Sequence, residues 1–94
     1  MLRFIAVHPI VFGEEQLKTL AQEPIPEGVT WKSTFCAFDD NRSYCHWEAP
    51  SRDAVTAIFA KYEIPYEALH EVRLFDPATG ELEAAPMEKV LQPA

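Results

Sequence analysis

The sequence predicts an α+β domain of the ferredoxin-like type, a βαββαβ plait in which a four-stranded antiparallel sheet carries two helices on one face. Three observations lead to this prediction: four segments have the composition of strands, two have the apolar spacing of helices, and the links between them are short. A chain of 94 residues has room for one domain. We expect that domain over residues 1–80, followed by a C-terminal tail over residues 81–94 that packs on its own domain or on a partner subunit.

The first strand and the first helix are expected near the N-terminus. Residues 2–7 form an apolar run with one arginine, which is typical of a central strand buried on both faces. His8-Pro9 ends this strand, because proline has no N–H to donate to the sheet. Gly13-Glu14-Glu15 begins a helix whose first turn the two carboxylates stabilise, and Pro24 lies beyond its end.

A hairpin and a second helix follow. Val29–Phe38 and Ser43–Glu48 are expected to be strands joined by the turn Asp39-Asp40-Asn41-Arg42. Ser51 is a suitable N-cap for a helix, and Ala68–Phe75 alternates like a fourth strand that ends at a turn. The apolar face of that helix is predicted to consist of Ala54, Val55, Ile58, Phe59 and Tyr62.

The arrangement of the sheet predicts a dimer. We expect the first and third strands as parallel neighbours at its centre. The helices cover one face only, whereas several strands offer bulky side chains to both faces, and a monomer rarely leaves so large an apolar face open. A two-fold homodimer through the open sheet face would cover it. The bulky pairs are Phe4 and Ile5, Trp31 and Phe38, and Tyr44 and Trp47.

Composition limits the class of partner and the compartment. Fifteen acidic and eight basic side chains give a formal charge of −7, which argues against nucleic acid and against an anionic membrane surface as partners. The N-terminus does not have the pattern of a signal peptide, and no apolar run approaches the roughly 18 residues of a membrane span. Cys36 and Cys45 are therefore expected to be reduced thiols in the cytoplasm.

The centre of the chain carries a set of motifs in a fixed order. These are Trp31, Asp39-Asp40, Tyr44-Cys45, Trp47-Glu48-Ala49-Pro50, Asp53-Ala54-Val55 and Ile64-Pro65. Over about residues 29–72 they resemble the DUF4242 family of small bacterial proteins, of which at least one member is described as nickel-binding. The resemblance implies a ferredoxin-like fold, dimerisation and a possible transition-metal cofactor such as nickel.

The same resemblance has one departure that bears on metal binding. Family members commonly carry a histidine two residues after the tryptophan, where this chain has Ser33, and another in the second helix near Ile58. If those histidines hold nickel in relatives, this chain has lost that site or has rebuilt it from other residues.

Imidazole, thiolate and carboxylate groups are ligands for nickel, zinc or copper. The residues of this chain that suit such a metal are His8, Cys36, Cys45, His46, Glu48 and His70. We expect the end of the first strand, the end of the third and the start of the fourth to share one edge of the sheet, although no pair has the close spacing of a structural metal motif. The predicted metal ligands are His8, His46, Glu48 and His70.

Each of these residues also has a structural explanation. His8 can cap the backbone at the strand end, His46 can be a partly exposed strand residue, and a nearby carbonyl can satisfy His70. Glu48 can bind the first amides of the following helix. Cys45 packs like a small apolar core residue, and Trp47 suits the core or a dimer interface.

Catalysis has little support in the sequence. Adjacent residues on a strand point to opposite faces, so Cys45 and His46 do not form a nucleophile and base. The three glycines do not cluster into a phosphate-binding loop. The sequence therefore favours a non-enzymatic binding protein. Two alternatives stay open: a barrel-like dimer that binds or converts a small molecule in an apolar pocket beneath Trp31, Tyr44 or Trp47, and an interaction module without a ligand.

Overall fold

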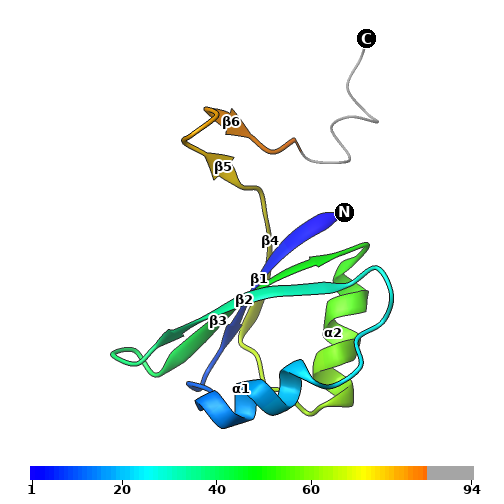
Figure 1. Ribbon diagram of the computed structural model, residues 1–94, viewed down its shortest axis with the longest axis vertical. Coiled ribbons are helices and arrows are strands. Elements are labelled where there is room, and N and C mark those ends of the chain that lie inside the picture. Colours follow the sequence, from blue (N-terminus) through cyan, green and yellow to red (C-terminus); the bar gives the residue numbers. More distant parts are fainter. Residues whose placement is uncertain (85–94) are drawn as a thin grey trace.

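The computed structural model describes residues 1–84 and has the predicted α+β architecture. Its main sheet has the strand order β2-β3-β1-β4, and both helices lie on one side of it (Figure 1). A separate two-stranded hairpin, β5 with β6, stands away from the main sheet (Figure 1). The elements are β1 (Leu2–His8), α1 (Glu14–Ala21), β2 (Thr30–Ala37), β3 (Arg42–Ala49), α2 (Arg52–Lys61), β4 (Ala68–Val72), β5 (Phe75–Asp76) and β6 (Glu81–Leu82).

All neighbouring strands of the main sheet are antiparallel, so the predicted parallel pairing of the first and third strands is wrong. In β1 and β3, Leu2 lies opposite Ala49 and His8 lies opposite Ser43. The path of the chain explains this: α1 carries the chain back so that β2 runs in the direction of β1, and the hairpin then reverses it in β3. The end of β1 therefore meets the start of β3.

The two faces of β1 differ in burial. Phe4, Ala6 and His8 are buried against the helices, whereas the side chains between them are only partly buried. The prediction of a strand buried on both faces is therefore wrong, because both helices lie on one side of the sheet.

The core lies between the sheet and α2. The rings of Trp47 and Trp31 stack across β3 and β2 with centroids 5.9 Å apart, and Trp47 meets Phe59 of α2 edge-on at 5.7 Å. As its spacing predicts, α2 buries Val55, Ile58 and Phe59, and Ser51 caps it by accepting a hydrogen bond from the amide of Ala54. None of the eight residues of α1 is buried, so α1 contributes far less to the core than α2.

The last predicted strand is shorter than expected. β4 ends at Val72, and Phe75 instead pairs with Leu82 in the β5–β6 hairpin. The turn of this hairpin uses the predicted Asp76–Gly80 segment, where Gly80 has a φ of +73°. The domain boundary expected at residue 80 falls within this hairpin, and residues 85–94 of the expected tail lie outside the described residues.

Ser43 fixes the loop that follows β1. Its side chain is fully buried, its hydroxyl donates to the carbonyl of Ile10 at 2.8 Å, and it accepts from the amide of Phe12 at 3.2 Å. The hydroxyl therefore satisfies two backbone groups and holds Phe12 in the core.

Replacing Ser43 with alanine should lower the free energy of unfolding by about 1–3 kcal/mol, because it leaves a buried amide and a carbonyl without this partner. Urea denaturation measures the change. Ser33→Ala, at an exposed position of β2, is the matched control and should have little effect. Equal stabilities of the two variants would contradict the role given to Ser43.

Candidate functional site

The open sheet face, the side of the main sheet without helices, carries three of the four predicted metal ligands. In the register of the sheet, His46 and His70 lie on either side of Ile5, and Glu48 lies beside Arg3. Adjacent strands are about 4.8 Å apart, so the backbones of the two histidines are about 10 Å apart. Residues 1–84 contain no group of three or more His, Cys, Asp or Glu side chains arranged to hold a metal ion.

His8 lies on the other face of the sheet. Its side chain is 1% exposed, and its Nδ1 lies 2.7 Å from the carbonyl oxygen of Pro65. This contact is the backbone hydrogen bond that the structural explanation predicted. Because side chains alternate along β1, the structure does not bring His8 together with His46, Glu48 and His70.

Arg3 is the centre of the polar cluster on the open face. Its Nη1 lies 2.6 Å from Nε2 of His46 and 3.1 Å from Oε2 of Glu48. Its Nε and Nη2 donate to the two carboxylate oxygens of Glu83 at 3.0 and 2.9 Å. Arginine only donates, so Nε2 of His46 accepts, and the guanidinium contacts both His46 and Glu48.

The charges of this cluster shift three pKa values. Burial, and then the charge of Arg3, lower the pKa of His46. The hydrogen bonds between Arg3 and Glu83 raise the pKa of the arginine and lower that of the carboxylate. His46 is therefore neutral near pH 7, which is the form that binds metal.

Sequence reasoning did not assign a role to Arg3 or Glu83. Arg3 could have been recognised because it is the one charged residue in an apolar strand. Side chains alternate along a strand, so Arg3 points to the face opposite Phe4 and Ala6. Glu83 had no local signal, because it reaches Arg3 through the fold of the β5–β6 hairpin, 80 residues away in the chain.

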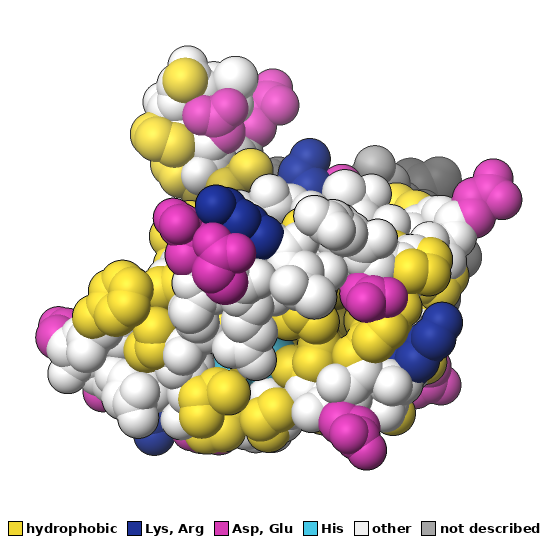
Figure 2. All heavy atoms as spheres, turned by 60° about the horizontal axis from the view of Figure 1, so that its bottom comes forward, with side chains coloured by type: hydrophobic (Ala, Val, Ile, Leu, Met, Phe, Trp, Pro, Cys, Tyr) yellow, Lys and Arg dark blue, Asp and Glu magenta, His cyan; other side chains and the backbone are white. Residues whose placement is uncertain are grey.

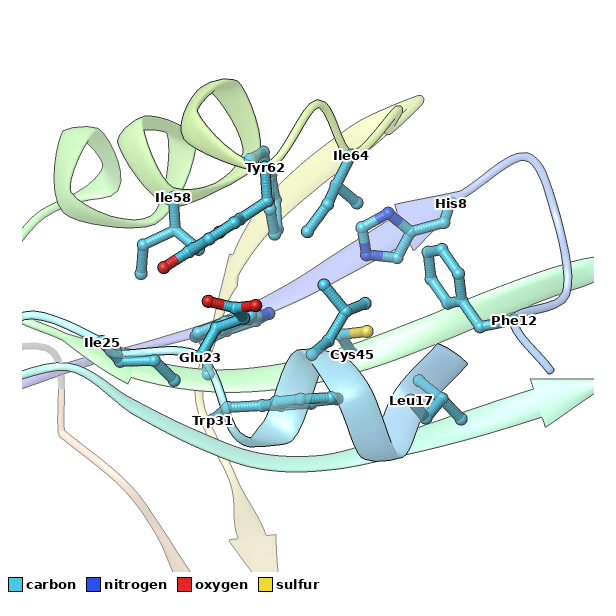
Figure 3. A pocket seen from close by; sticks show the side chains of 13 residues that line it. His8, Phe12, Leu17, Glu23, Ile25, Trp31, Cys45, Ile58, Tyr62 and Ile64 are labelled. Atoms are coloured by element: carbon cyan, nitrogen blue, oxygen red, sulfur yellow. The ribbon is translucent and has the colours of Figure 1, made fainter. Parts of the chain in front are cut away.

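The second feature is a hollow between the two helices and the sheet, on the opposite side from the polar cluster. Figure 2 shows hydrophobic side chains gathered around it, and Figure 3 shows side chains from the sheet, α1 and α2 facing one another across it. Trp31 and Trp47 line it, as the small-ligand alternative predicted, but Tyr44 lies on the open face beside Phe35. The inner space measures about 30 Å³, which is room for one or two water molecules.

Cys45 also lines this hollow and is inert there. Its Sγ lies 3.1 Å from the hydroxyl of Thr34, and burial raises the pKa of its thiol to about 11. A thiol that stays protonated at neutral pH is a poor nucleophile. Cys36 and Cys45 are both free, and the core position predicted for Cys45 is confirmed.

The family model described as "Nickel responsive protein SCO4226-like" matches residues 11–72 of this chain. The chain belongs to this family. The matched range includes His46, Glu48 and His70, and it excludes His8 and Glu83. The expected link to a nickel-associated family is thus confirmed for the SCO4226-like family over residues 11–72.

One solved structure supports the fold. The protein SCO4226 from Streptomyces coelicolor A3(2) superposes with a TM-score of 0.61 over 77% of this chain and 96% of that chain, at 23% sequence identity. This likeness supports the ferredoxin-like fold of the present chain. No curated protein matches the sequence. No helix within residues 1–84 is long and apolar enough to cross a membrane.

His8 should make stability depend on pH. Burial lowers the pKa of His8 below its ordinary value of 6.5, so the unfolded chain takes up a proton at a higher pH than the folded chain does. The contribution of neutral, buried His8 to the free energy of unfolding is complete above pH 6.5. It is lost as the pH falls toward the pKa of His8 in the folded protein. Denaturation between about pH 7 and pH 5 should show a steeper loss of stability in the wild type than in His8→Phe. Identical slopes would contradict this account.

Proposed function

We propose that this protein is a homodimer that binds a divalent transition-metal ion, nickel in the first instance, on its open sheet face. The ligands are His46, Glu48 and His70. The observation that carries the proposal is that these three metal-ligating side chains share one face of the sheet, within the range that the nickel-responsive family model matches. Imidazole nitrogens and carboxylate oxygens are suitable ligands for nickel.

The position of Ser33 supports this choice of ligands. The bulge between Trp31 and Ser33 turns Trp31 toward Trp47 in the core and sets Ser33 beside His46 on the open face. Ser33 is the position at which the resemblance to relatives places a histidine. His46 in this chain therefore lies next to the position of the missing histidine. A metal site rebuilt from other residues would need a ligand close to that position.

A second copy of the chain would complete the coordination. His46 and His70 are too far apart across Ile5 for a compact site in one protomer, since metal–nitrogen bonds are about 2 Å long. The same face also exposes 64% of Phe35. Pairing two open faces about a two-fold axis would cover this apolar surface and bring a second set of ligands to the first.

Isothermal titration calorimetry with Ni²⁺ tests the metal site. We expect binding tighter than about 1 mM in the wild type and a loss of about tenfold or more in His46→Ala and in His70→Ala. Glu48→Gln should weaken binding, whereas the matched control Glu71→Gln should not, because Glu71 pairs with Phe4 on the other face. Light scattering should report the mass of two chains. The absence of binding tighter than about 1 mM would refute the metal site, and a monomer with nickel present would refute the dimer.

Replacing Arg3 tests the competition between guanidinium and metal. Arg3→Met removes a cation that contacts both His46 and Glu48, so the affinity for Ni²⁺ should rise by about tenfold, or ~1.4 kcal/mol. Arg3→Lys keeps the charge and should bind nickel more weakly than Arg3→Met. If the methionine variant binds less tightly than the wild type, Arg3 organises the ligands and does not compete with the metal.

A further inference from the structure

Two buried nitrogen atoms in the hollow between the helices and the sheet have no hydrogen-bond partner within residues 1–84. They are Nε2 of His8 and Nε1 of Trp47, whose residues are 1% and 4% exposed. Burying a polar atom without a partner destabilises a protein, so native structures usually supply one. Trp31 illustrates the usual outcome, since its Nε1 donates to the hydroxyl of Thr34 at 2.8 Å.

The hydrogen bond between His8 and the carbonyl of Pro65 determines which ring nitrogen of His8 carries the proton. A carbonyl oxygen only accepts, so Nδ1 of His8 carries the proton and Nε2 is a bare acceptor. Figure 3 shows the imidazole of His8 facing the hollow between Phe12 and Ile64. The hollow therefore presents an acceptor at His8, and Trp47 in its lining carries an N–H donor without a partner in residues 1–84. Both rings pack against Phe59, with centroids 5.1 and 5.7 Å from it.

We propose that this hollow is a binding site for a small neutral aromatic molecule with a hydroxyl group, a phenol or an aromatic alcohol, whose hydroxyl donates to Nε2 of His8. The aromatic ring would pack among Trp31, Trp47 and Phe59. The site lies on the helix side of the sheet, so it goes beyond the metal function proposed above and does not depend on it.

The lining excludes charged ligands. An anion would meet the lone pair of His8 and the carboxylate of Glu23, which also borders the hollow (Figure 3). A cation would lose its hydration among side chains that are almost all apolar. A neutral hydroxyl group gives His8 the donor that it lacks at the smallest desolvation cost.

A ring-sized ligand would enter by displacing α1. The inner space of about 30 Å³ is smaller than the roughly 150 Å³ of an apolar cavity that holds benzene, although the whole hollow, with its part open to solvent, encloses about 420 Å³. Of the elements that border it, α1 has no buried residue, and it contributes Leu17 and Leu20. An outward shift of α1 would therefore widen the hollow without moving a fully buried residue of that helix.

NMR titration of the metal-free protein with phenol and with toluene tests the proposal. The two probes differ by the hydroxyl group, so wild-type protein should bind phenol more tightly, by about threefold to tenfold, and with a dissociation constant below about 1 mM. The indole N–H signal of Trp47 should shift in a saturable manner, together with the amide signals of α1.

Variants separate a His8 hydrogen bond from general apolar binding. His8→Leu keeps an apolar side chain but removes the acceptor, so the preference for phenol over toluene should disappear, while toluene binding persists as evidence that the variant is folded. Tyr44→Phe removes a hydroxyl on the open face and should keep the preference. Equal affinities for the two probes in the wild type, or no saturable shift with either because water alone fills the hollow, would overturn the proposal. Nickel binding is measured separately, so failure here leaves the metal proposal intact.

Discussion

The antiparallel pairing of β1 with β3 is the constraint on which the rest of the structure depends. The pairing sets Ile5 beside His46 and Ala6 beside Cys45, and so assigns each central residue to one face of the sheet. One set of side chains packs beneath the helices and forms the core. The other set remains on the open face, where Arg3 gathers a histidine and two carboxylates. A shift of one residue in this register would exchange the two sets and destroy both the core and the polar cluster.

The two faces of the sheet have different chemistry. The helix side is largely apolar and nearly filled, and the buried side-chain atoms without a hydrogen-bond partner in residues 1–84 are two ring nitrogens there. The open side is charged, and its polar atoms contact one another through a guanidinium. The two proposals follow this difference, with a metal ion assigned to the charged face and an uncharged ring to the apolar one. The side chains that the two proposals use do not overlap.

Features with a local cause could be predicted from the sequence. The capping hydroxyl of Ser51, the buried stripe of α2 and the opposite directions of Cys45 and His46 follow from spacing and residue type alone. The grouping of predicted ligands depends on strand direction and register, which residue type does not determine. For that reason His8 was grouped with His46 although the structure sets them on opposite faces. The positions of Arg3 and Glu83 depend on contacts between distant segments, and α1 lacks buried residues although its leucines have helical spacing.

The segment after β4 lies beyond residues 11–72, which the family model matches. Its Glu83 carboxylate nevertheless accepts hydrogen bonds from Arg3, the central residue of the polar cluster on the open face. The charge of that surface is thus set partly by a residue that follows the β5–β6 hairpin and not by the main sheet alone. A substitution in the β5–β6 segment can therefore alter the charge around Arg3 without altering any residue of the four main strands.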